Sequence, residues 1–174
     1  MAALPQFLER KTHVDLYRRD IEPYFRRAVL LVFVGVSAAG LANVFGQHTR
    51  TVSADSAAAK LTVEAPHAAR GGLIYQVRFQ IDAHSALEKP ALALGPGWFD
   101  GLTINTVEPD LVKWSEENGR TVAELPAIQA GHHLVVRLQY QVNPTVIGHR
   151  PQDVVLEDGG EPVVTVRHDQ LIFP

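Results

Sequence analysis

The feature that most constrains this chain is an uncharged stretch from Ala28 to Gln47. It is built mainly of Ala, Val, Leu, Gly and Phe, and Ser37 and Asn43 interrupt it. About 20 residues in an α-helix reach about 30 Å, the thickness of the hydrocarbon core of a bilayer. A helix buried in a globular domain usually keeps a polar face, which this stretch lacks. The sequence therefore predicts one transmembrane helix over residues 28–47.

Basic residues are unequally distributed on the two sides of this helix. Those before it are Arg10, Lys11, Arg18, Arg19, Arg26 and Arg27, whereas those shortly after it are Arg50 and Lys60. Segments rich in Lys and Arg stay in the cytoplasm. Residues 1–27 are therefore predicted to be a cytoplasmic segment that lies on the membrane lipid. The rest of the chain is predicted to lie outside the cytoplasm, as in a single-pass protein of the cell membrane.

Two other features of the apolar stretch leave alternatives open. Ser37-Ala38-Ala39 resembles a signal-peptidase site, so the domain could instead be secreted after cleavage. The apolar run continues past these small residues for a full span, which favours an uncleaved anchor. Gly35, Ala39 and Asn43 are spaced four residues apart and could let another helix pack closely, although Gly and Ala are common in membrane helices in general.

Charge and cysteine content exclude several classes of function for the remainder. Residues 48–174 carry more Asp and Glu than Lys and Arg, without a cluster of basic residues, so nucleic acid is a poor candidate partner. The chain has no cysteine, which excludes disulfides, thiol catalysis and zinc sites built on cysteine. Residues 48–59 are small and polar and are predicted to be a flexible tether.

From residue 60 to 174 the pattern is that of short β-strands. Leu73, Tyr75, Val77, Phe79 and Ile81 alternate with Gln76, Arg78, Gln80 and Asp82, which predicts a strand with one buried and one wet face. A second such strand has Leu134, Val136, Leu138, Tyr140 and Val142 inward and Arg137, Gln139 and Gln141 outward. Shorter candidate strands cover residues 60–65, 91–94, 102–107, 111–115, 120–125, 153–156 and 163–167.

Turn residues separate these strands and fix how some of them connect. Asn118-Gly119 favours a two-residue hairpin loop, because both residues readily adopt positive φ. Several short strands without amphipathic helices between them indicate an antiparallel β-sandwich. The predicted fold class is thus mainly β, with one transmembrane helix before the sandwich.

The stretch from Glu124 to Leu138 resembles the corner of bacterial immunoglobulin-like domains. In those domains a leucine, a spacer and an alanine-glycine step precede a long alternating strand, as Leu125, Ala130 and Gly131 do here. The resemblance extends loosely over residues 60–174. It implies adhesion, spacing or protein recognition rather than any fixed chemistry. The immunoglobulin cysteine pair is absent, so it concerns the wider cysteine-free sandwich class.

Residues that could carry chemistry do not form a recognisable motif. His132 and His133 are adjacent on a strand and point to opposite faces, so they cannot readily share a metal ion. His149 or His168 could approach one of them in a folded sheet, but no His-x-His or carboxylate spacing supports a metal site. Glu116 and Glu117, with Glu108 and Asp110, could supply paired carboxylates near Trp114, but charged residues around a hairpin are more often a solvated edge. No nucleophile elbow or phosphate-binding loop occurs in the sequence, and we expect no catalytic, cofactor or metal site.

Aromatic residues mark the remaining candidate sites. Trp98 and Phe99 lie in a glycine-rich loop and either plug one end of the sandwich or form a contact patch, and the plug is favoured because Trp and Phe usually supply core area. The possible interaction residues are Trp98, Phe99 and Trp114. We expect a non-enzymatic interaction module or an accessory subunit of a membrane complex, with another membrane or extracytoplasmic protein as its partner. The alternatives are a ligand-binding, glycan-binding or hydrolytic domain, or a secreted domain.

Overall fold

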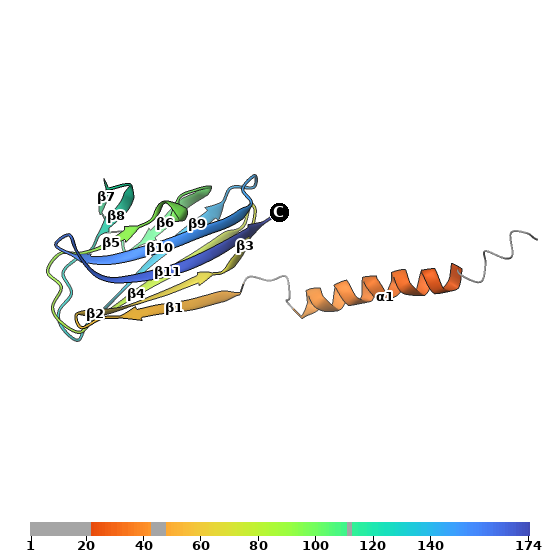
Figure 1. The fold of residues 1–174 in the computed structure, drawn as a ribbon, viewed down its shortest axis with the longest axis horizontal. Coiled ribbons are helices and arrows are strands. Elements are labelled where there is room, and N and C mark those ends of the chain that lie inside the picture. Colours follow the sequence, from red (N-terminus) through yellow and green to blue (C-terminus); the bar gives the residue numbers. More distant parts are fainter. Residues whose placement is uncertain (1–21, 43–47, 111–112) are drawn as a thin grey trace, which may run out of the picture. The chain divides into compact units, whose positions relative to one another are not determined.

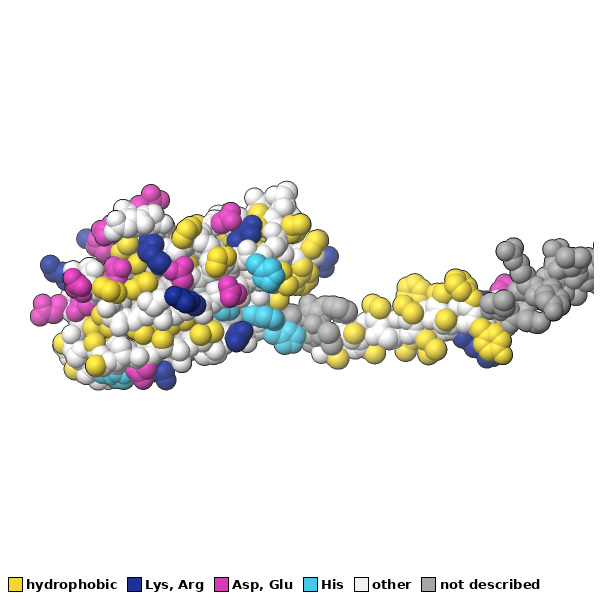
Figure 2. Space-filling view, viewed as in Figure 1, with side chains coloured by type: hydrophobic (Ala, Val, Ile, Leu, Met, Phe, Trp, Pro, Cys, Tyr) yellow, Lys and Arg dark blue, Asp and Glu magenta, His cyan; other side chains and the backbone are white. Residues whose placement is uncertain are grey.

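The computed structural model describes residues 22–42, 48–110 and 113–174, and the chain divides into two compact units between Gly46 and Gln47. The first unit contains helix α1 (Glu22–Leu41), none of whose side chains is buried. By length and composition, α1 is the one helix of the described residues that could cross a membrane. Its surface in Figure 2 is largely hydrophobic, as the predicted span requires.

The bounds of α1 differ from the predicted 28–47, because the helix begins earlier and residues 43–47 lie outside the described part. The negative charge of Glu22 is favourable near the positive, N-terminal end of the helix dipole. Pro23 lies in the first turn, where its missing N–H costs no hydrogen bond. Charge marked the start of the predicted span, but Arg26 and Arg27 are good helix formers and do not end the helix. The last part of the predicted segment 1–27 is therefore helical.

The second unit is a β-sandwich of two sheets (Figure 1). The five-stranded sheet has the order β1-β2-β4-β9-β6, with the strands β1 (Thr49–Asp55), β2 (Ala59–Pro66), β4 (Ile74–Ala83), β9 (His133–Val142) and β6 (Leu102–Glu108). The six-stranded sheet has the order β3-β11-β10-β5-β8-β7, with the strands β3 (Ala68–Arg70), β11 (Glu161–Phe173), β10 (Gly148–Asp158), β5 (Pro90–Leu94), β8 (Arg120–Glu124) and β7 (Lys113–Glu117). The immunoglobulin-like β-sandwich predicted from the sequence is confirmed.

The two long alternating strands occur where they are predicted. On β4, Tyr75, Val77, Phe79 and Ile81 are buried, although Leu73 precedes the strand and is 37% exposed. On β9, Val136, Leu138, Tyr140 and Val142 are buried and Leu134 is half-buried. The two strands pair antiparallel, with Val77 opposite Leu138 and Phe79 opposite Val136, so their apolar faces together form one side of the core.

The predicted tether over residues 48–59 is wrong, because Thr49–Asp55 form strand β1 and the sandwich starts there rather than at Lys60. All seven residues of β1 pair with β2, from Thr49 opposite Pro66 to Asp55 opposite Lys60. The strand lies at a sheet edge, and Val52 and Ala54 are its side chains packed against the core. A strand with so few buried positions has too little apolar alternation to be distinguished from a polar linker.

At two places between strands, the backbone geometry explains the type of residue. Asn118 and Gly119 have φ values of 52° and 73° and join β7 to β8, with Glu117 opposite Arg120, which confirms the predicted hairpin. Gly97 lies in the short 3-10 helix η4 (Pro96–Trp98), where a Cβ would lie 1.9 Å from the carbonyl oxygen of Pro151. Glycine therefore lets η4 approach β10 closely enough to place Trp98 in the core.

One pair of strands departs from the predicted antiparallel pattern. The short strand β3 runs parallel to β11, with Ala68 opposite Leu171 and Arg70 opposite Phe173. Its three residues could not be recognised from alternation.

Candidate interaction face

The outward side of the five-stranded sheet is an open polar surface. Alternation places one side chain in two on this side, and strand pairing aligns them into rows that run across the sheet. We call this surface the polar sheet face; its central residues are Thr62, Glu64, Gln76, Arg78, Gln80, Asp82, Arg137 and Gln139. The sequence analysis predicted the wet faces of β4 and β9 separately, and the structure shows that they lie side by side.

The central row carries four charges. It runs Glu64, Arg78, Arg137 and Glu108 across strands β2, β4, β9 and β6. Arg78 Nη1 lies 3.7 Å from Glu64 Oε2, and Arg137 Nη1 lies 3.6 Å from Glu108 Oε2. Both pairs are well exposed, so each contributes less than about 1 kcal/mol to stability. The row therefore leaves its charged groups available at the surface.

A hollow of about 400 Å³ opens beside the two arginines. The pairing of β2 with β4 stops at Glu64 and Arg78, while β4 continues to Ile74 paired with β9. The hollow lies where β2 and β4 separate, and its lining residues are Thr49, Glu64, Pro66, Tyr75, Gln76, Arg78 and Arg137. Within the described part of the chain, Arg78 Nε is shielded from solvent without a hydrogen-bond partner. Such an unmet donor typically costs about 1–3 kcal/mol.

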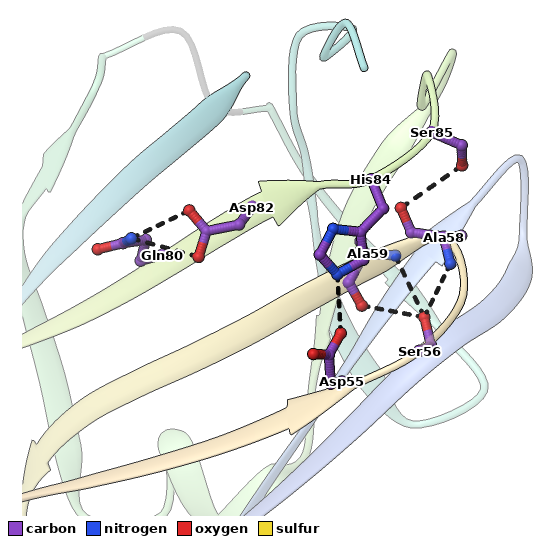
Figure 3. Close-up of polar contacts among 8 residues, drawn as sticks. All are labelled: Asp55, Ser56, Ala58, Ala59, Gln80, Asp82, His84 and Ser85. Carbon is purple, nitrogen blue, oxygen red and sulfur yellow. Dashed lines mark hydrogen bonds and ion pairs between the residues drawn. The ribbon is translucent and has the colours of Figure 1, made fainter. Parts of the chain in front are cut away.

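At the other end of the face, hydrogen bonds link side chains and backbone around the turn between β1 and β2 (Figure 3). Ser56 Oγ accepts hydrogen bonds from the amides of Ala58 and Ala59, and His84 Nε2 lies 2.8 Å from Asp55 Oδ1. The hydrogen bond with His84 lowers the pKa of the fully exposed Asp55 carboxyl. The polar groups at this end therefore hydrogen-bond to one another, in contrast to the charged groups of the central row.

The structure places the predicted contact residue Trp98 in the core. Trp98 is 0% exposed, and its Nε1 donates a hydrogen bond of 3.0 Å to the carbonyl oxygen of Asp153. Its ring packs edge-on against Phe79, with centroids 5.3 Å apart. Phe99 is half-buried against the same core. The predicted plug is therefore confirmed for Trp98, which cannot be part of an exposed patch.

The other predicted site residues are more widely separated. Trp114 is 38% exposed on the edge strand β7 of the six-stranded sheet, so it does not contribute to the polar sheet face. Gly35 and Ala39 lie on α1, and no atom would contact a Cβ at Gly35. Asn43 lies outside the described residues, so the helix-packing seam stays a prediction.

The candidate carboxylates are divided between the sheets. Glu108 ends β6 of the five-stranded sheet, whereas Glu116 and Glu117 belong to β7 of the six-stranded sheet. Glu117 lines a hollow of about 450 Å³ on the six-stranded sheet together with Glu88, Glu124 and Glu157. Glu116 and Glu117 therefore share a strand with Trp114, whereas Glu108 belongs to the other sheet.

The predicted histidine candidates also lie in different settings. His132 and His133 are exposed, whereas His168 is 4% exposed and lies 3.3 Å from the carbonyl oxygen of Pro66. Burial lowers the pKa of His168, against the hydrogen bond with Pro66, which raises it. In residues 22–42, 48–110 and 113–174, no group of three His, Asp or Glu side chains could hold a metal ion.

Sequence analysis missed a buried polar cluster between the sheets. Gln170 Oε1 accepts hydrogen bonds from Tyr75 Oη at 2.9 Å and from Gln152 Nε2 at 3.1 Å, and Gln170 Nε2 donates to Pro66 O. Burial raises the pKa of Tyr75 to about 12. These glutamines alternate with exposed residues at positions where apolar residues are expected, so a search for apolar alternation cannot find them.

The similarities of this chain to known proteins are distant. No protein-family model and no curated protein matches the chain. Among solved structures, the chain is similar to CaCohA2 from Clostridium acetobutylicum (TM-score 0.49, 11% identity, covering 68% of this chain and 92% of that chain). It is also similar to a non-cellulosomal cohesin from Archaeoglobus fulgidus (TM-score 0.41, 14% identity, 72% and 91% covered). A third structure is the CARDB domain of a Pyrococcus furiosus protein (TM-score 0.41, 10% identity, 64% and 84% covered).

Proposed function

We propose that this chain is a membrane-anchored interaction module whose polar sheet face docks onto another protein outside the cytoplasm. The observation that carries the proposal is the charged row Glu64, Arg78, Arg137 and Glu108 on an open sheet face beside a hollow. Charges with few satisfied hydrogen bonds at a surface can steer and orient a partner. Such a module fits an accessory subunit of a membrane complex.

Helix α1 supports the anchoring part of this proposal. It spans 20 residues and none is buried among the described residues, so its apolar side chains need an apolar environment. A bilayer supplies that environment. The basic residues before the helix favour a cytoplasmic N-terminus. The proposal includes no catalytic activity; among the candidate carboxylates, Glu108 lies on one sheet and Glu116 and Glu117 on the other.

The anchor and its orientation are tested by labelling introduced thiols. The chain has no cysteine, so Gln6→Cys and Thr165→Cys each provide a single reactive site. In sealed native cells, a membrane-impermeant maleimide is expected to label Thr165→Cys at once and Gln6→Cys after permeabilisation. The reverse pattern would contradict the orientation. An intact mass without the residues up to Ala39 would show cleavage and refute the anchor.

Docking on the polar sheet face is tested with the same chemistry. Gln139→Cys lies on this face, and Thr165→Cys is an exposed control on β11 of the six-stranded sheet. In native membranes we expect Gln139→Cys to react about tenfold more slowly than Thr165→Cys, because a bound partner excludes the reagent. The purified full-length variants should react at similar rates. Equal rates in native membranes would refute docking on this face.

A further inference from the structure

The central row of the polar sheet face does not have the alternating charges found elsewhere on this face. In the row at the Asp55 end, Asp55, Lys60 and Asp82 alternate in sign across three strands. In the central row, Arg78 lies directly opposite Arg137. Like charges on directly opposite residues of an antiparallel pair repel each other. The two arginines, called here the arginine pair, are therefore the place on this face where an added negative charge gains most.

Among the described residues, most hydrogen-bond donors of the arginine pair have no protein acceptor. Each guanidinium has five N–H donors. Arg78 Nη2 donates to Gln80 Oε1 at 3.1 Å, and among the described residues Arg137 makes no side-chain hydrogen bond. The distances of 3.7 and 3.6 Å to Glu64 and Glu108 exceed the range of a hydrogen bond. Arginine forks of this kind match the geometry of an oxyanion.

The hollow supplies room beside these donors. Both arginines line it, and the exposed side chain of Gln76 adds an amide that can donate to the same anion. Pro66 and Tyr75 form part of the lining beside these donors. The local charge favours a monoanion over a dianion, because Glu64 and Glu108 offset part of the positive charge of the two arginines and would repel a second negative charge.

We propose that the arginine pair and Gln76 form a carboxylate-binding site, occupied by an acidic side chain of the partner protein. This assignment rests on the proposed function, since it names the group that the docked partner presents. Each guanidinium donates to a carboxylate oxygen, while Glu64 and Glu108 flank the arginine pair along the row. Specificity for an acidic partner residue follows from this arrangement.

The test is an acetate titration of the full chain in detergent micelles, at constant ionic strength, followed by nitrogen-15 NMR of the arginine Nε–H groups. We expect saturable shifts at Arg78 and Arg137. Arg137→Gln should weaken acetate binding about tenfold, the effect of losing one charge-assisted hydrogen-bonding group. The matched control is Arg167→Gln on the six-stranded sheet, which removes the same charge and should leave acetate binding unchanged. Inorganic phosphate should bind more weakly than acetate.

Three outcomes would overturn the carboxylate site. The first is a set of shifts that grow linearly with acetate, as non-specific ion association would give. The others are equal acetate binding by Arg137→Gln and tighter binding of phosphate than of acetate. The proposed function is tested separately by the protection of Gln139→Cys. If that thiol is protected in native membranes but acetate does not bind, docking stands and the carboxylate assignment fails.

Discussion

Trp98→Ala is expected to lower the free energy of unfolding of the sandwich by about 3 to 5 kcal/mol, the usual cost of truncating a fully buried aromatic residue. Trp98 lies between the sheets, where it contacts Phe79, Tyr140 and His168. The substitution also leaves the carbonyl oxygen of Asp153 without its hydrogen bond from Nε1. The loss would be a large part of the stability of a typical domain.

Urea unfolding of the full chain in mild detergent, followed by circular dichroism, measures this effect. Trp114→Ala is the matched control, because it removes the same side chain from a position that is 38% exposed on an edge strand. The control should cost less than about 1 kcal/mol. Equal losses for the two variants would contradict the placement of Trp98 in the core.

Val77→Asp is expected to destabilise the sandwich severely, whereas Gln76→Asp is tolerated. Val77 is 0% exposed between the sheets, and no cation of the described residues lies in this core cluster to pair with a new carboxylate. An unpaired buried charge typically costs about 3 to 5 kcal/mol. The neighbouring Gln76 is exposed on the polar sheet face, where water solvates the carboxylate.

Thermal melting of the two variants distinguishes these positions, since each adds the same side chain one residue apart. The Val77→Asp domain should melt well below the parent, or not fold. Closely similar melting temperatures would contradict the inward and outward assignment of β4.

Alternation predicts the strands of this fold best where apolar residues fill the core. β4 and β9 follow that pattern, and both were located from the sequence. β10 and β11 are much longer than the predicted 153–156 and 163–167, because Gln152, His168 and Gln170 occupy buried positions in the extended parts. These polar residues hydrogen-bond to one another and to Pro66 O, which local sequence does not show.

The candidate site could be predicted only in part, because its arrangement depends on pairing between strands that are distant in sequence. The outward orientation of Arg78 and Arg137 follows from alternation within each strand. Their direct opposition depends on the register between β4 and β9, which are far apart in sequence. The hollow depends on where the pairing of β2 with β4 stops, which is also a tertiary feature. The residue types at the site were therefore available from the sequence, but their arrangement was not.

Strand β1 gives the sandwich a mechanical property that a flexible tether would lack. It is the first strand after the helix and lies at a sheet edge, so tension from the N-terminal side enters the domain through the seven residues paired with β2. Peeling β1 from β2 would release about 24 Å of contour length. Strands β4 and β9, which carry the arginine pair, lie further inside the sheet and would keep their pairing with each other. The edge strand can thus yield under load as an extensible element while the arginine pair stays in place on β4 and β9.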